Sequence, residues 1–319
     1  MNYGLPYQGS KNRIAKRLVD ALPPAPVLYD VFCGGCAVTH AAMLSGKYQR
    51  FVVNDRRGWL PDAFRKAIHG GYAHEDRWIS REDFECLKST DAYAAMCFSF
   101  GNDARSYMYA RPLEPYKRAL HHAIFWRDFA PWRELCPETA DALAAGLAPI
   151  EDRKQRRVQA GHFIVESLKS RAEMLTPDIL QKPIYRQIRR RKDTQHQSLQ
   201  SLGCLERLQS LESLERLPGA LTVYSMDYQE MRFDEPGIIY CDPPYKDTAD
   251  KSKDYADTSF DAEVFYSWCE AQKLPVYISE YQMPEDRFVC IAEWDKVTTM
   301  AAKTTTHVTE RLWRPRTQL

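Results

Sequence analysis

The stretch that decides the fold is Pro26-Val27-Leu28-Tyr29-Asp30-Val31-Phe32-Cys33-Gly34-Gly35-Cys36-Ala37-Val38-Thr39. A short apolar, partly β-branched run enters a loop of small residues, and a helical pattern follows. This order predicts a strand, a tight turn and a helix at the carboxyl edge of a parallel sheet, where small residues let the backbone approach a nucleotide-like ligand. The loop lacks the full dinucleotide glycine fingerprint, which disfavours a nicotinamide cofactor.

Two more apolar runs end in acidic residues. The run Phe51-Val52-Val53 leads into Asn54-Asp55, at a spacing where an acidic residue suits a ribose diol. The run Gly237-Ile238-Ile239-Tyr240-Cys241 leads into Asp242-Pro243-Pro244-Tyr245. Both runs read as buried strands, so the acidic residues are expected at strand ends.

The turn Asp242-Pro243-Pro244-Tyr245 indicates a site that holds a planar amino group. An exocyclic amine such as adenine N6 is a poor nucleophile because its lone pair is delocalised into the ring. The Asp242 carboxylate and the Pro243 carbonyl can accept hydrogen bonds from its two N–H groups, and the prolines limit rearrangement of the turn. Tyr245 offers a ring on which an extruded base can stack. The alternative is an ordinary proline-containing turn.

Three motifs in order carry a resemblance to a known family. Leu5-Pro6-Tyr7-Gln8-Gly9-Ser10-Lys11, the glycine loop and Asp242–Tyr245 resemble the motifs of Dam-like DNA adenine-N6 methyltransferases, the D12 class, alpha group. The chain is most similar to the solitary enzymes of phages and prophages, over about residues 3–55 and 221–314. The resemblance implies a site-specific, S-adenosylmethionine-dependent methyltransferase in which adenine N6 attacks the methyl group directly after base flipping. It also implies an α/β fold, a doubly wound Rossmann-like methyltransferase sheet with an inserted, mostly helical target-recognition region.

The resemblance also implies roles for individual residues. Asp242, Pro243, Pro244 and Tyr245 would be catalytic. The cofactor would be bound by Tyr7 and Lys11 beside its methionine moiety, with Lys11 near the carboxylate, by Asp30, Phe32 and Gly34 in the loop, by Asp55 at the ribose and by Asp227 at the adenine amine. For Asp227 the alternative is a strand-terminal residue that caps the next turn. Cys36 stands where a second glycine is usual, which leaves the geometry and affinity of the loop open.

The charge distribution bears on DNA as a partner. Net charge is only +1, but residues 151–200 hold twelve Lys or Arg against six Asp or Glu, concentrated in Arg189, Arg190, Arg191 and Lys192. Such a cluster can follow the phosphate backbone of double-stranded DNA. A solvated helix face is the alternative.

The spacing of the strand signals predicts an insertion. Strand signals at residues 27–54 resume only at 221–226, and an α/β connection of that length must hold structure of its own. We expect a catalytic domain from residues 1–110 and 196–319 and an inserted target-recognition region at 111–195. Leucines at every third position from 199 to 217 predict a helix packed on the core, and self-association stays open. Strands near 275–281, 288–294 and 308–313 predict an antiparallel hairpin at the end of the sheet.

Composition limits the remaining classes. No apolar run reaches the length of a membrane span and the N-terminus shows no signal-peptide pattern, so we expect a cytoplasmic protein. Nine scattered cysteines suit a reducing compartment, and the single Cys33–Cys36 pair does not predict a metal site. No nuclease motif is evident, so restriction activity within this chain is not expected. A cytosine-N4 methyltransferase, which usually has Ser in place of Asp242, an enzyme acting on RNA or protein glutamine, and a catalytically silent DNA-binding protein remain as alternatives.

Overall fold

The computed structural model describes residues 2–7, 9–170, 178, 181–190, 199–217, 219–244, 260–300 and 304–319. The chain forms two compact units, Met1–Gly71 with Leu211–Leu319, here called the sheet unit, and Tyr72–Ser210, here called the helical unit. In chain order the helical unit therefore interrupts the sheet unit once.

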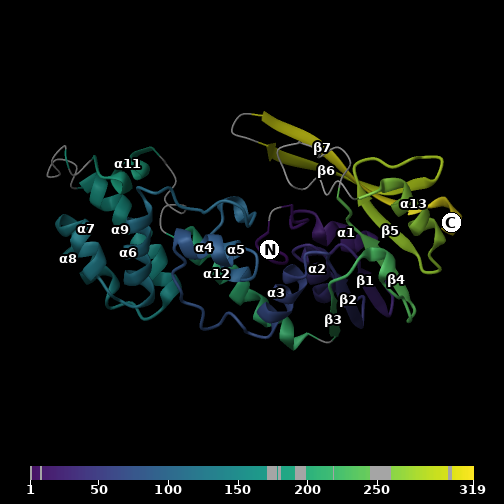
Figure 1. Ribbon diagram of the computed structural model, residues 1–319, viewed down its shortest axis with the longest axis horizontal. Helices are drawn as coiled ribbons and strands as arrows, with labels where there is room; N and C mark the ends of the chain where they lie inside the picture. Colours follow the sequence, from purple (N-terminus) through teal and green to yellow (C-terminus); the bar gives the residue numbers. More distant parts are fainter. Residues whose placement is uncertain are drawn as a thin grey trace. The chain divides into compact units, whose positions relative to one another are not determined.

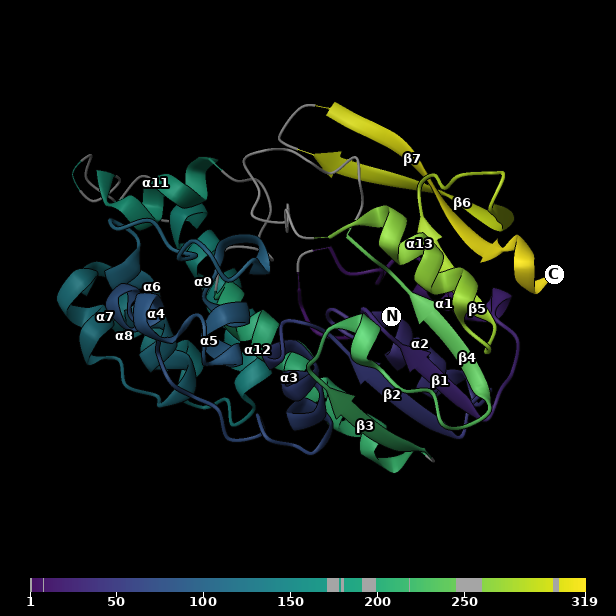
Figure 2. The same ribbon diagram turned by 45° about the vertical axis from the view of Figure 1, so that its right-hand side comes forward.

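The sheet unit contains a seven-stranded sheet in the order β3-β2-β1-β4-β5-β7-β6 (Figure 2). Its strands are β1 Val27–Asp30, β2 Arg50–Asn54, β3 Ala220–Tyr224, β4 Gly237–Cys241, β5 Val276–Glu280, β6 Phe288–Met300 and β7 Thr304–Pro315. Neighbours among β1 to β5 pair in parallel, whereas β7 runs antiparallel to both β5 and β6. The predicted α/β, doubly wound sheet ending in an antiparallel hairpin is confirmed. The hairpin is longer than the sequence indicated (Figure 1).

Helices cover both faces of this sheet because side chains alternate along each strand. Val27 and Tyr29 of β1 lie in one apolar cluster with Phe265 and Cys269 of α13 (Ala262–Ala271). Asp30 points the other way, toward Thr39 of α2 (Ala37–Ser45). Helix α2 packs on α1 (Ala15–Ala21), and α3 (Trp59–Ile68) packs against β3. Three 3₁₀ turns complete the described part of the unit, η2 at Leu211–Arg216, η3 at Tyr228–Glu230 and η5 at Arg316–Gln318.

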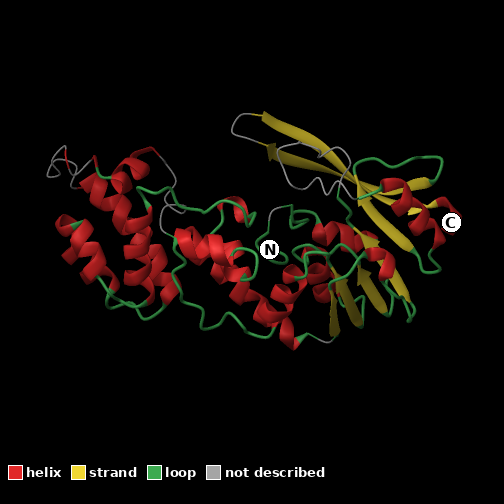
Figure 3. Ribbon diagram, in the orientation of Figure 1, coloured by secondary structure: helices red, strands yellow, loops and turns green. Residues whose placement is uncertain are grey.

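The regular elements described in the helical unit are helices (Figure 3). They are α4 Arg81–Leu87, α5 Ala92–Cys97, η1 Phe100–Asn102, α6 Glu114–Phe125, α7 Ala130–Leu135, α8 Pro137–Leu147, α9 Arg153–Ser170, α11 Pro183–Arg190 and α12 Gln200–Ser210. Local caps explain two of the starts, since Ser80 forms a capping box with Asp83 and the Asp91 carboxylate accepts from the N–H groups of Tyr93 and Ala94.

The helical unit is longer than the region 111–195 expected to be inserted. Helix α5 packs on α12, and the Tyr109 and Ser201 hydroxyls lie 3.0 Å apart. The Cys97 and Cys204 sulfurs also lie 3.0 Å apart in the buried interior. These contacts join the segments before 111 and after 195 to each other, and Arg157 of α9 pairs with Glu206 of α12, so the later segment also packs with the expected region. A target-recognition role for this unit stays a prediction.

The leucine-rich run is confirmed as a buried helical segment, with a change of winding inside it. Helix α12 ends at Ser210 and continues as the 3₁₀ turn η2, Leu211–Arg216. Because a 3₁₀ helix has about three residues per turn, a leucine at every third position keeps one face apolar there. Leu211 and Leu214 are accordingly buried.

In the part of the chain that the structure describes, every helix is too short or too polar to cross a membrane.

Candidate active site

The glycine loop follows β1 and is shaped by two residues in left-handed conformation. Gly34 has φ +48° and Cys36, which caps α2, has φ +54°. The Cys36 N–H donates to the Cys33 carbonyl at 2.7 Å, and the Cys33 N–H donates to the Asn54 carbonyl at 2.9 Å. A Cβ on Gly34 would meet no heavy atom within 4 Å, so the loop presents open backbone at this position.

Asp55 holds this loop from the end of β2. One of its carboxylate oxygens accepts from the Gly34 N–H at 2.9 Å, and the other accepts from the Arg57 N–H at 2.9 Å. Burial raises the pKa of Asp55, and these two backbone hydrogen bonds oppose that rise. The residue predicted to meet the ribose is therefore positioned beside Gly34, because the same carboxylate orders the loop.

Asn54, which the sequence analysis did not single out, joins the ends of three strands. Its side-chain N–H₂ donates to the carbonyls of Val31 and Met226 at 3.1 Å each, and its Oδ1 accepts from the Met226 N–H at 3.0 Å. The side chain is buried. Asn54 thus fixes the spacing between the loop after β1 and the segment after β3 that carries Asp227.

Asp30, at the end of β1, is buried beneath the loop. It accepts a hydrogen bond of 2.6 Å from the Thr39 hydroxyl through Oδ2, while its Oδ1 has no hydrogen-bond partner among the described residues. Burial raises the pKa of Asp30 to about 7, and the Thr39 hydrogen bond only partly offsets this effect. A buried carboxyl with an unsatisfied oxygen is consistent with a ligand that brings a hydrogen-bond donor.

Asp242 follows β4 and forms an ion pair with a buried lysine. The Lys11 ammonium lies 2.9 Å from Asp242 Oδ1 and 3.2 Å from Glu310 Oε1 of β7, and Lys11 is only 5% exposed. The Ser279 hydroxyl of β5 donates to Glu310 Oε1 at 2.8 Å. The structure therefore places Lys11, predicted to bind the cofactor carboxylate, against the predicted catalytic carboxylate.

Glu280 adds a second buried carboxyl at the end of β5. Burial raises the pKa of Glu280 to about 8, while the N–H of Tyr281, which donates to its Oε1 at 2.7 Å, opposes the rise. The nearby Asp242 charge acts in the same direction as burial. Acidic groups thus come from the carboxyl ends of β1, β4 and β5 and from the middle of β7, and Lys11 lies against two of them, Asp242 and Glu310.

Three other predicted cofactor residues lie in the same unit. The Tyr7 hydroxyl accepts from Arg57, and its ring meets Trp59 edge to face. The Phe32 ring packs with Tyr228. Asp227 is exposed and caps η3 by accepting from the Gln229 N–H at 2.9 Å. The capping alternative for Asp227 is thus observed, and a carboxylate that caps a turn retains further acceptor capacity.

Some predicted residues cannot be placed. Tyr245, Arg191 and Lys192 lie outside the described residues. Arg189 and Arg190 are the last residues of α11. Pro243 is buried and Pro244 is exposed.

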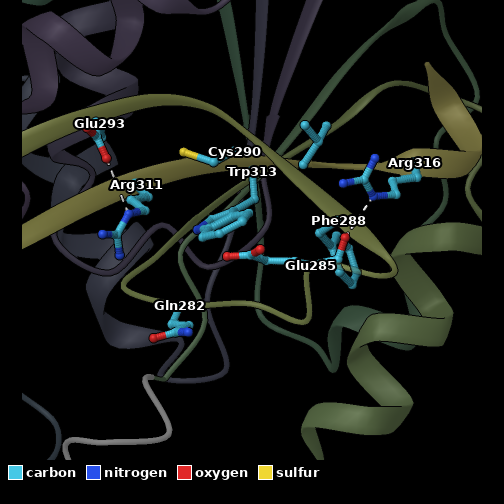
Figure 4. A pocket seen from close by; sticks show the side chains of 9 residues that line it. Gln282, Glu285, Phe288, Cys290, Glu293, Arg311, Trp313 and Arg316 are labelled. Atoms are coloured by element: carbon cyan, nitrogen blue, oxygen red, sulfur yellow. Dashed lines mark hydrogen bonds and ion pairs between the residues drawn. The ribbon is translucent and has the colours of Figure 1, made fainter.

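A pocket of about 380 Å³ lies at the base of the β6–β7 hairpin (Figure 4). Arg311 pairs with Glu293 at its rim, Arg316 donates to the Glu285 carbonyl, and Trp313 forms part of the lining. None of the predicted site residues lines it. The pocket is therefore separate from the set of residues around Gly34 and Asp242.

Comparison with known proteins bears on this site. Residues 7–88 match the family model for D12 class N6 adenine-specific DNA methyltransferase, which confirms the D12 class resemblance over that segment, while the solitary phage or prophage type stays a prediction. No curated protein matches the chain. Among solved structures, the rRNA methyltransferase aviRa from Streptomyces viridochromogenes is similar with 11% identity, over 94% of this chain and 82% of that chain, at a TM-score of 0.32. A likeness of that size carries no argument about substrate.

Proposed function

We propose that this chain, an adenine-specific DNA methyltransferase by its D12 class match, transfers a methyl group from S-adenosylmethionine to adenine N6 by direct attack after base flipping. The observation that carries the proposal is the adjacency of the glycine loop and Asp242. Strands β1 and β4 are paired neighbours, and the Val31 N–H donates to the Tyr240 carbonyl at 3.0 Å. Ligands of open α/β sheets bind at this kind of position, where the strand order reverses.

The residues present fit S-adenosylmethionine. Gly34 leaves open space where any side chain would project, Asp30 Oδ1 is a buried acceptor without a described partner, and Asp55 and Asp227 stand at the ends of β2 and β3. Asp55 would accept from the ribose hydroxyls and Asp227 from the adenine amine. When bound, the cofactor supplies a methyl group activated by a positively charged sulfur. Tyr7 would lie beside its methionine moiety.

The chain's own groups would prepare the target amine. Asp242 and the Pro243 carbonyl would accept hydrogen bonds from the two N–H groups of N6, which localises the nitrogen lone pair. Pro243 and Pro244 keep the turn stiff because each fixes its own φ. Holding the amine and the methyl group in line contributes a large part of such a rate enhancement. Tyr245 would stack on the flipped base.

DNA binding would involve the helical unit. Residues 151–200, with twice as many cationic as anionic side chains, belong almost entirely to it. Positive charge of this kind gives salt-dependent binding to phosphates. We therefore assign target recognition to this unit, with Arg189, Arg190, Arg191 and Lys192 as backbone contacts.

The test is incubation with labelled S-adenosylmethionine and unmethylated genomic DNA, followed by digestion and identification of the methylated nucleoside. We expect N6-methyladenine in the wild type and none in Asp242→Ala, which should still bind S-adenosylmethionine. N4-methylcytosine would replace the proposal by the cytosine reaction. Cofactor binding without methylated DNA would refute it, as would methylation by Asp242→Ala.

A further inference from the structure

Lys11, near the N-terminal end of the sequence, lies between two carboxylates that both come from its C-terminal third. Asp242 follows the central strand β4, whereas Glu310 belongs to β7, the strand inserted between β5 and β6. Their oxygens approach the Lys11 ammonium to 2.9 and 3.2 Å, and Glu310 is fully buried. The Ser279 hydroxyl fixes the same Glu310 oxygen from β5 at 2.8 Å. A chain of contacts thus runs from Ser279 through Glu310 and Lys11 to Asp242.

The protonation state of Lys11 is consistent with this series of contacts. Burial alone lowers the pKa of Lys11, but the Asp242 and Glu310 charges outweigh burial and leave the pKa above its ordinary value. The amine therefore stays protonated over the physiological range. A buried ion pair is an inefficient way to stabilise a fold, since taking the charges out of water costs as much as their attraction contributes. Because the ion pairs of Lys11 lie against the Asp242-Pro243-Pro244 turn, we infer that they serve the reaction rather than the stability of the fold.

We propose that Glu310 is a positioning residue for methyl transfer, which acts through Lys11 to fix the orientation of the Asp242 carboxylate. Lys11 donates to Oδ1 of Asp242, so the carboxylate is already oriented when the amine arrives. Glu310 and Ser279 prevent Lys11 from turning away. This inference rests on the proposed function, and it gives Lys11 a partner other than the cofactor carboxylate.

The test uses Glu310→Gln in the full chain. Glutamine keeps an acceptor for Ser279 but removes the charge that holds Lys11. We expect the single-turnover methylation rate to fall about tenfold or more, as for the loss of a charge-assisted hydrogen bond, with an unchanged dissociation constant for S-adenosylmethionine. Glu293→Gln is the matched control, because Glu293 is an exposed carboxylate on the same hairpin, and it should keep the wild-type rate.

The pH profile gives a readout that a purely structural role would not move. The titratable groups around Asp242 are Lys11 from the N-terminal segment, Glu310 of β7, Glu280 of β5 with the adjacent Tyr281, Asp30 of β1, and Tyr240 and Cys241 of β4. If Glu310→Gln frees Lys11, the Asp242 carboxylate loses the ammonium that lies 2.9 Å from its Oδ1, and the loss of this close opposite charge outweighs the loss of the Glu310 charge and favours the protonated carboxyl. The acid limb of the single-turnover rate should therefore move to higher pH in Glu310→Gln and stay in place in Glu293→Gln, whereas a move to lower pH would show that Lys11 has stayed in place and would overturn the inference.

A wild-type rate and pH profile in Glu310→Gln would overturn the inference, and so would a rate loss matched by weaker cofactor binding. If Glu310→Gln does not fold, Ser279→Ala decides, since it keeps all the charges. Ser279→Ala should lower the rate less, with unchanged cofactor affinity, and a wild-type rate in that variant would then refute the role. Absence of N6-methyladenine in the wild type would instead refute the proposed function itself.

Discussion

Replacing Asn54 by alanine tests whether this side chain holds together the loop after β1 and the segment after β3. Its three hydrogen bonds, to the carbonyls of Val31 and Met226 and from the Met226 N–H, would be lost. Each contributes a net of about 0.5–1.5 kcal/mol, so the free energy of unfolding should fall by about 3 kcal/mol. For a unit of 150–250 residues this lowers Tm by roughly 6–12 °C.

The assay is urea and thermal unfolding followed by circular dichroism, with S-adenosylmethionine affinity measured on the folded protein. Affinity should also fall, because Asp55 and Asp227 lie next to the groups that Asn54 joins. Asn2→Ala is the control, since Asn2 is exposed and accepts from Asn12 at the surface. A loss within 0.5 kcal/mol of the control, about what a surface substitution gives, would refute the reasoning.

Three further predictions concern the two units. Asp30 has a folded-state pKa of about 7, above its ordinary 3.8, so its contribution to stability is present below pH 4 and lost as pH rises through 7. Asp30→Asn should therefore unfold with a flatter pH dependence between pH 4 and 8 than the wild type, and a difference between them that is constant across pH would contradict this. Gly34→Ala should weaken S-adenosylmethionine binding, as measured by calorimetry. Gly46→Ala, with a similar positive φ and an equally open Cβ position, should leave that affinity unchanged and lower only the free energy of unfolding, by about 1–2 kcal/mol of backbone strain. Equal affinities of these two variants would refute the contact with Gly34. Phe100, 68% exposed in the helical unit, should lose DNA affinity in a binding titration when changed to alanine, with no loss of Tm, and a titration matching that of Val158→Ala would argue against a DNA contact.

Local patterns predicted the central sheet well. The runs before Gly34, Asp55 and Asp242 each form a strand of four or five residues, and the strand ends meet at one edge as expected. These segments are apolar on both faces because helices cover the sheet from both sides. Such continuous apolar runs are typical of parallel strands in α/β proteins, so they can be recognised from the sequence. The acidic residues at the strand ends could therefore be found without knowledge of the fold.

Contacts between residues far apart in the sequence could not be predicted in the same way. Glu310 is one of several polar residues in the last strand, and its contact with Lys11 depends on β7 lying beside β5 in antiparallel register. A signal was present, since Glu310 is two residues from the fully buried Leu312 and shares its side of the strand. The role of Asn54 was even harder to predict, because an asparagine after a strand is as common in an ordinary turn as in a position where its side chain joins two strands.

The helical unit, Tyr72–Ser210, begins earlier and ends later than the region 111–195 that the sequence spacing indicated, for a related reason. Residues 72–110 include Tyr109, whose hydroxyl lies 3.0 Å from that of Ser201, far along the chain. Sequence spacing placed them with the catalytic part because they follow α3 directly. Packing between α5 and α12 assigns them to the helical unit instead.

The position of Glu310 has a consequence for synthesis of the protein. Lys11 leaves the ribosome well before Glu310, so the ion pair closes only after β7 has been synthesised. Contacts between such distant parts of a sequence form slowly, because a long loop must close before they are gained. Strands β1 and β2 can pair during translation, but the Asp242 carboxylate obtains its complete surroundings only after β7 has been synthesised. A nascent chain therefore has the pairing of β1 with β2 and the loop after β1 before it has the Lys11–Asp242–Glu310 cluster.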